Sequence, residues 1–142
     1  MNSAVYQILK QRGLSILFII LVCLIVFFHL WNLESLPRGL YVDESSIGFN
    51  AALISQTGRD EHGDFFPTYF KAFGEYKNPL FIYSASILFK LFGISVFSLR
   101  LTSFLFFLIL IVCVYLLTRY LFPENRVLPF YTLLATSFLP WF

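Results

Sequence analysis

Acidic side chains concentrate in one stretch of this chain. Of its eight Asp and Glu residues, seven lie between Asn32 and Asn78. Long apolar runs with almost no charge flank this stretch on both sides. Ionisable groups near lipid are costly to keep, so we expect chemistry in this polar island. Its main candidates are the adjacent acids Asp43 and Glu44 and, further along, Lys77.

Adjacent residues on a helix point about 100° apart, so Asp43 and Glu44 cannot form a facing acid–base couple. One of them can face a site while the other holds a backbone or cationic partner. A purely structural role for Asp43 is the N-cap of a following helix, worth about 1 kcal/mol. The corresponding role for Lys77 is that of an interfacial anchor. The position of Asp43, directly after an apolar run and inside an acidic loop, favours a functional role.

Further candidates lie in the polar turn TGRDEHGD and beside Lys77. Asp60, Glu61 and His62 are consecutive, so they could ligate one metal ion only on a sharp loop. We therefore expect a solvated loop here rather than a metal site. We keep as candidates for substrate binding Asp60, Glu61, His62, Glu75 and Tyr76. No phosphate-binding loop, dinucleotide fingerprint, zinc-protease motif or nucleophile elbow is present in the sequence.

The composition predicts an integral membrane protein. Hydrophobic residues make up 58% of the 142 residues and charged residues 13%, whereas soluble domains are about half apolar and about a quarter charged. Cys23 and Cys113 lie in apolar runs and are interpreted as small hydrophobic residues. No basic patch supports nucleic-acid binding. The last apolar run, 127–142, is shorter than the about 20 residues of a full span, so we interpret the chain as the N-terminal part of a longer protein.

We predict an all-α integral membrane fold, in one domain over residues 1–142. Transmembrane helices are expected at 14–31, 101–122 and 127–142, with surface helices at 43–56 and 80–92 in the loop 32–100. The first surface helix begins at Asp43, stops at Gly58, and carries an apolar stripe of Ile47, Ala51 and Ile54. Residues 65–79 are aromatic and are expected to be irregular. The second surface helix spans only about 20 Å, which is short of the about 30 Å hydrocarbon core.

Basic residues set the expected orientation. Lys10 and Arg12 mark one cytoplasmic end, and Arg119 and Arg126 mark another. These ends share a side only if residues 80–92 do not cross the membrane. We therefore expect a cytoplasmic N-terminus and an extracytoplasmic loop 32–100, in a bacterial or archaeal plasma membrane.

An ordered set of motifs resembles glycosyltransferase family 39. The set comprises a first membrane helix, the pair Asp43-Glu44, an amphipathic helix ending in TG, an RDEHG-like turn, a K-x-P-L motif at Lys77, and KLFGISVFSLRL at 90–101. Protein O-mannosyltransferases and lipid A aminoarabinose transferases belong to this family, which has the C-type membrane glycosyltransferase fold. The resemblance covers residues 14–142.

The resemblance implies a transferase that moves a sugar from a polyprenyl-phosphate donor to a hydroxyl of a glycan, lipid or protein acceptor, on the extracytoplasmic face. Asp43 matches the family's loop aspartate, which is the catalytic base or an acid that contacts a metal ion. A divalent metal ion is the one cofactor implied. Glu44, the adjacent acid, is the second candidate catalytic residue. Lys77 matches the residue that holds the lipid phosphate. The chain departs from the family in having Asn78 where many members have proline, and in placing Tyr76 between Glu75 and Lys77. The family's second acid, in the loop after the third span, has no counterpart before Phe142.

Two other functions stay open. A transporter or channel segment predicts ionisable residues inside the spans, yet the cores 14–31 and 101–118 contain none apart from His29. A non-catalytic membrane piece that binds a partner membrane protein is the other alternative, because three spans alone are not expected to close a site.

Overall fold

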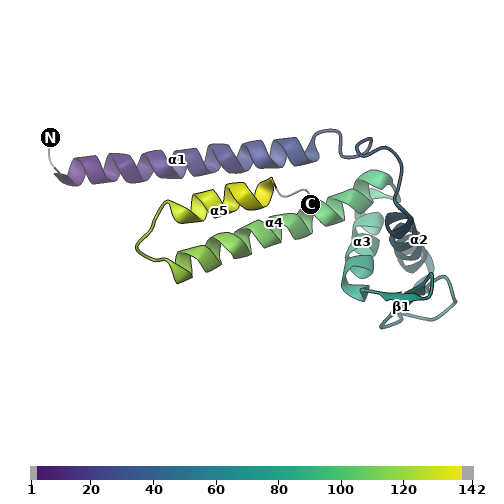
Figure 1. Ribbon diagram of the computed structural model, residues 1–142. Coiled ribbons are helices and arrows are strands. Elements are labelled where there is room, and N and C mark those ends of the chain that lie inside the picture. Colours follow the sequence, from purple (N-terminus) through teal and green to yellow (C-terminus); the bar gives the residue numbers. More distant parts are fainter. Residues whose placement is uncertain (1–2, 139–142) are drawn as a thin grey trace. The chain divides into compact units, whose positions relative to one another are not determined.

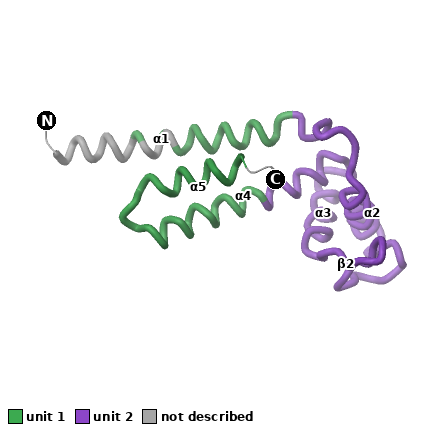
Figure 2. Tube along the Cα trace, viewed as in Figure 1, with its two compact units in different colours: residues 1–31, 107–142 green, residues 32–106 purple. Residues whose placement is uncertain are grey.

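The computed structural model describes residues 3–138, with the side chains of residues 13, 16 and 18–138. The chain is mostly helical. Its elements, in order, are α1 Ser3–Leu30, α2 Val42–Thr57, β1 Phe70–Ala72, β2 Glu75–Lys77, α3 Pro79–Phe92, α4 Val96–Leu121 and α5 Leu128–Ser137 (Figure 1). It divides into two compact units, one of residues 32–106 and one of residues 1–31 and 107–142 (Figure 2).

The core of the unit 32–106 lies where α2 and α3 pack together with the first turn of α4. Its buried side chains are Ala51, Ile54, Phe70, Ile82, Ala85, Phe89 and Leu99. The predicted stripe of α2 is confirmed, because Ala51 and Ile54 are buried and Ile47 packs against them.

Helix α2 begins one residue earlier than predicted. Its N-cap is Tyr41, in an extended conformation, and the Glu44 carboxylate accepts a hydrogen bond from the Tyr41 backbone N–H at 3.3 Å. The predicted N-cap role of Asp43 is therefore wrong: Asp43 lies inside the first turn, where its side chain is available to another partner. Gly58 ends the helix as predicted, with φ +71° and its N–H donating to Ile54 O.

The aromatic segment contains a hairpin, so the expectation that it is irregular is wrong, although the chain as a whole is mostly helical. Strands β1 and β2 are antiparallel and pair Phe70 with Lys77, Lys71 with Tyr76 and Ala72 with Glu75. Phe70 and Ala72 are buried while Lys71 between them is exposed, which is the alternation of a strand with one covered face. Two three-residue strands are too short for this alternation to stand out in a sequence.

Helices α3 and α4 follow the hairpin. Asn78 caps α3, accepting a hydrogen bond from Leu80 N–H at 2.9 Å, and Pro79 occupies the first helical turn. The 14 residues of α3 span about 21 Å, and one face of the helix is buried in the core. Ser95 caps α4, with its Oγ accepting from Ser98 N–H at 3.1 Å.

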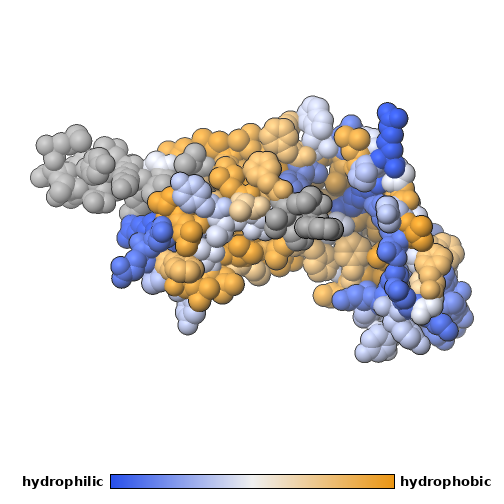
Figure 3. Space-filling view, viewed as in Figure 1, coloured by the Kyte–Doolittle hydropathy of each residue, from blue (hydrophilic) through white to orange (hydrophobic). Residues whose placement is uncertain are grey.

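The other unit contains α1, α5 and the C-terminal part of α4. Aromatic rings join the three helices, with centroid distances of 5.2 Å between Phe18 and Tyr115, and 5.6 Å between Phe18 and Phe130. The hydroxyls of Thr118 and Thr132 lie 3.2 Å apart. The outer surface of these helices is largely hydrophobic (Figure 3).

Among the described residues, α4 is the one helix that is long and apolar enough to cross a membrane. It contains residues 101–121 of the predicted span 101–122 and begins five residues earlier, at Val96. The described apolar part of α1, Phe18–Leu30, and α3 are shorter apolar helices. α5 covers Leu128–Ser137 of the predicted span 127–142, whose residues 139–142 lie outside the described part. The three-span arrangement therefore stays a prediction.

Candidate functional site

The structure brings Asp43 and Lys77 into direct contact. Lys77 Nζ donates to Asp43 Oδ1 at 2.5 Å, across 34 residues of sequence. Asp43 is in the first turn of α2, and Lys77 is the last residue of β2, directly before the N-cap of α3. The pair therefore lies at the N-terminal ends of two helices, where the partial positive charge of unpaired N–H groups favours anions.

The two partners differ in exposure. The Lys77 side chain is only 16% exposed, whereas that of Asp43 is 62% exposed. The hydrogen bond to Asp43 raises the pKa of the Lys77 ammonium above its ordinary 10.5, helped by the negative charges of Asp43 and Glu75 and opposed by desolvation. Lys77 is thus a fixed cation at neutral pH, beside a carboxylate that solvent and a substrate can reach.

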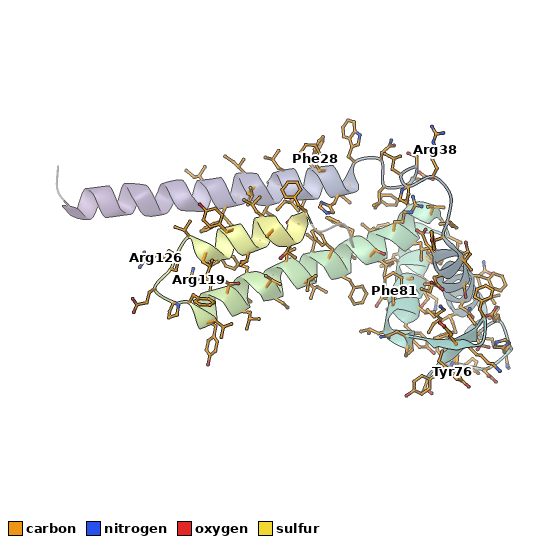
Figure 4. The ribbon with its side chains drawn as sticks, in the orientation of Figure 1. Phe28, Arg38, Tyr76, Phe81, Arg119 and Arg126 are labelled. Atoms are coloured by element: carbon orange, nitrogen blue, oxygen red, sulfur yellow. The ribbon has the colours of Figure 1, made fainter. Side chains whose placement is uncertain are left out.

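The two predicted neighbours of Lys77 are placed differently. Glu75 Oε2 lies 3.8 Å from Lys77 Nζ, so this exposed carboxylate is a second, weaker partner. Tyr76 pairs with Lys71 across the hairpin and contacts Tyr69 at 6.3 Å between ring centroids. Tyr76 projects from the hairpin into solvent (Figure 4). Successive residues of a strand face opposite ways, which separates Tyr76 from Lys77.

Glu44 has partners of its own. Its Oε1 accepts a hydrogen bond from Arg100 Nε at 2.8 Å, and its Oε2 accepts from Tyr41 N–H. The Arg100 side chain is 6% exposed. The two adjacent acids therefore have different partners, as expected. Asp43 faces outward and binds Lys77, whereas Glu44 binds the Arg100 guanidinium and the Tyr41 backbone N–H.

Arg100 also binds three backbone carbonyls in the segment between α1 and α2. Its NH2 donates to Gly39 O at 2.7 Å, and its NH1 donates to Leu33 O at 3.1 Å and to Glu34 O at 3.3 Å. Arg100 was part of the KLFGISVFSLRL motif but was not predicted as a site residue. The signal was available, because it is a charged side chain at the edge of an otherwise uncharged run.

The predicted cluster Asp60, Glu61 and His62 organises the loop after α2. Asp60 is buried, and its Oδ1 accepts from the N–H groups of His62 and Asp64, both at 2.9 Å. Glu61 exchanges two hydrogen bonds with the buried side chain of Asn50, each at 3.1 Å. His62 Nε2 donates to Lys71 O at 2.9 Å. The expectation of a solvated loop is thus wrong for Asp60, and these contacts tie the loop to α2 and to the hairpin.

The residues around Asp43 do not fit a divalent metal ion. Its carboxylate carries the Lys77 ammonium, which repels a second cation. Within residues 3–138, no group of three or more His, Cys, Asp and Glu side chains lies close enough to hold a metal ion.

Comparisons with protein-family models, with curated proteins and with solved structures found no match to this chain. The resemblance to glycosyltransferase family 39 therefore rests on the sequence motifs alone.

Proposed function

We propose that the chain forms part of a membrane glycosyltransferase, which moves a sugar from a polyprenyl-phosphate donor to an acceptor hydroxyl at the extracytoplasmic face. The contact between Asp43 and Lys77 is the observation that carries this proposal. A carboxylate and an ammonium group are the two groups that such a reaction requires. The motif order points to these same two residues.

A sugar linked to phosphate is already activated, so the enzyme has two tasks. It must remove a proton from the acceptor hydroxyl, and it must stabilise the departing phosphate. Asp43 serves as the general base, an effect worth about 10²–10⁴-fold in rate. Lys77 stabilises the phosphate, and a fixed cation is most effective in a poorly hydrated position; its side chain is largely covered.

The bond changes are those of a single displacement. The acceptor oxygen forms a bond to the anomeric carbon, and the bond from that carbon to the phosphate oxygen breaks. The electron pair leaves with the polyprenyl phosphate, whose negative charge meets Lys77. The acceptor proton passes to Asp43. In the substrate-free pair, Lys77 and Asp43 neutralise each other, and the incoming phosphate replaces Asp43 as the partner of Lys77.

The membrane arrangement belongs to this proposal. Helices at 14–31, 101–122 and 127–142 cross the plasma membrane, α3 stays at its surface, and residues 32–100 are extracytoplasmic. Arg119 and Arg126 lie at the turn between α4 and α5 (Figure 4), and this turn faces the cytoplasm. Within the described part, α4 carries no Asp, Glu, Lys or Arg between Arg100 and Arg119, so a charged permeation path through it has no support.

Transfer assays test the proposal. Membranes containing the protein are supplied with polyprenyl-phosphate-linked radiolabelled hexoses and pentoses, and label is followed into glycan, lipid and protein fractions. Asp43→Asn is expected to lose about 100-fold or more in rate, and Lys77→Met to lose activity by weakening donor binding. Asp64→Asn, an exposed acid in the same unit, serves as the control. Full activity in Asp43→Asn would overturn the assignment of the base.

A further inference from the structure

We infer that Arg100 is a positioning residue: it fixes the first turn of α2 and thereby keeps Asp43 against Lys77. The inference concerns the geometry of the Asp43–Lys77 pair, and its catalytic consequence rests on the proposed function. Arg100 touches neither member of the pair; it acts through Glu44 and through the backbone that leads into α2.

All three guanidinium nitrogens of Arg100 are engaged. Nε donates to the Glu44 carboxylate, NH2 to Gly39 O, and NH1 to Leu33 O and Glu34 O. A guanidinium is planar, and its donors have a fixed relative geometry. The four acceptors are therefore held in one arrangement, and they come from two segments, residues 33–39 and the first turn of α2.

The segment 33–39 depends on these bonds. It contains no helix or strand of its own, so its backbone groups need partners from elsewhere. Arg100 supplies three of them, from the start of α4. This places the chain that enters α2 at a defined position relative to α4.

Glu44 links the position of Arg100 to the position of Asp43. One Glu44 oxygen is bound by Arg100 and the other by the Tyr41 N–H, so the rotation of the first turn is fixed. Asp43 is the preceding residue of that turn and lies about 100° around the helix. A turn that rotates or frays carries Asp43 away from Lys77. A misplacement of about 1 Å costs about 10²-fold in a reaction that relies on position.

The first test measures the pair directly and needs no sugar transfer. An impermeant amine-reactive ester is added to membranes, and acylation of Lys77 is quantified by mass spectrometry relative to the exposed Lys71. Asp43→Asn sets the rate for a Lys77 that has lost its ion pair with Asp43. We expect Arg100→Met to raise the relative acylation of Lys77 toward that rate, and Arg119→Met, at the exposed far end of α4, to leave it unchanged.

Arg100→Lys separates position from charge. A lysine keeps the positive charge but cannot reach four acceptors in the fixed geometry of the guanidinium, so we expect Lys77 acylation close to that of Arg100→Met. Wild-type acylation in both Arg100→Met and Arg100→Lys would overturn the inference, whether or not the protein transfers sugar. Wild-type acylation in Arg100→Lys alone would show that charge suffices, and would overturn the positioning role.

The catalytic consequence has a separate measurement. In Arg100→Lys we expect kcat to fall at least tenfold while the KM for the donor changes less than threefold, because Lys77 still binds phosphate. A purely structural role would lower the amount of folded enzyme and leave the rate per folded molecule unchanged. Absence of transfer in the wild type would overturn the proposed function, while Lys77 acylation would still decide the role of Arg100.

Discussion

Asp43 and Glu44 are neighbours in sequence, and their carboxylates serve different partners. Asp43 reaches Lys77 across the surface of the unit 32–106, while Glu44 points to the buried Arg100. The difference in exposure matters chemically. An exposed carboxylate can exchange its partner for a substrate, whereas breaking a buried ion pair leaves an uncompensated charge and costs about 3–5 kcal/mol. The first turn of α2 thus carries one exposed, exchangeable ion pair, Asp43–Lys77, and one buried, fixed pair, Glu44–Arg100.

The Asp43–Lys77 pair has a defined pH range. The folded state raises the pKa of Lys77, so the stabilisation from the pair is complete below the ordinary value of 10.5 and is lost as pH rises through the folded value. We expect Lys77→Met to lower Tm at pH 7 and at pH 9, and the difference from wild type to shrink above about pH 10.5.

Lys71→Met, at the exposed residue on the opposite face of the hairpin, is the control for this comparison. It removes the same charge without removing the contact, so its Tm should stay close to wild type across the series. Equal effects of the two substitutions at pH 7 would show that the contact contributes nothing to stability.

Phe73 is strained at the tip of the hairpin. Its φ is +53° and that of Gly74 is +83°, the pattern of a type I′ turn, which favours Asn-Gly. The left-handed conformation costs most residues about 1–2 kcal/mol, and the Phe73 side chain is 75% exposed. We expect Phe73→Asn to stabilise the protein by about 1 kcal/mol, measured by thermal denaturation. Phe73→Ala keeps the strain and should give no gain.

At the residue scale, sequence reasoning identified both members of the Asp43–Lys77 contact but not the network behind them. Residue type and position suggest which side chains are reactive. They do not show that Arg100 reaches back to carbonyls at Leu33, Glu34 and Gly39, because that depends on a tertiary contact between distant segments. The burial of Asp60 depends in the same way on the closure of its loop.

At the element scale, the helices were predictable and the hairpin was not. The periodic stripe of α2, the stop at Gly58, and the Asn78-Pro79 start and Gly93 end of α3 are local signals, and each helix follows them within a residue or two. The hairpin depends on the burial of Phe70 against α2 and α3, which a run of aromatic residues does not reveal. Its turn also lacks the Asn-Gly signal.

Gly48 makes the packing of α2 against α4 possible. A Cβ at this position would lie 2.9 Å from Leu99 Cδ2, which is a buried side chain of the core. We expect Gly48→Val to destabilise the protein by about 1–3 kcal/mol through overpacking, and Gly48→Ala to do so less, because the end of the Leu99 side chain can rotate. Denaturant titration in detergent measures both effects.

Gly13 in α1 provides the matched control, since a Cβ there meets nothing within 4 Å. Gly13→Ala should be neutral or stabilising, because alanine favours a helix by about 1 kcal/mol over glycine. If Gly48→Val were as well tolerated as Gly13→Ala, then Leu99 would not be packed against α2 as described.

At the scale of the whole molecule, charge is divided between the two units. The unit 32–106 contains seven of the eight acids of the sequence. The described side chains of the other unit are mostly apolar, and its surface is correspondingly hydrophobic (Figure 3). The proposed membrane arrangement accounts for both features, because it buries the apolar helices in lipid and leaves the acidic unit in water. The distribution of acids along the sequence predicted this division, because it can be read without knowledge of packing.

The side of the membrane reached by residue 94 tests this arrangement. If α3 stays at the surface, then the α3–α4 connection lies outside and the α4–α5 turn lies inside. We expect a cysteine at Ile94, an exposed residue in that connection, to react with an impermeant maleimide in intact cells. A cysteine at Glu124, in the α4–α5 turn, should react only after permeabilisation. Both variants are made with Cys23→Ala and Cys113→Ala, so that the introduced cysteine is the one source of label.

The two cysteines together distinguish the possible topologies. Labelling of both from outside would mean that α4 does not cross, despite its 26 residues and uncharged centre. Labelling of Ile94→Cys only after permeabilisation would mean that α3 crosses the membrane.

A crossing α3 would be too short for the membrane. The 14 residues of α3 span about 21 Å, so a hydrocarbon core that is about 30 Å thick would have to thin locally around the helix. In that case the hairpin with Lys77 and the start of α4 with Arg100 would need to lie on opposite faces. Because Asp43 binds Lys77 and the adjacent Glu44 binds Arg100, we instead expect the hairpin and the start of α4 to lie on the same face of the membrane.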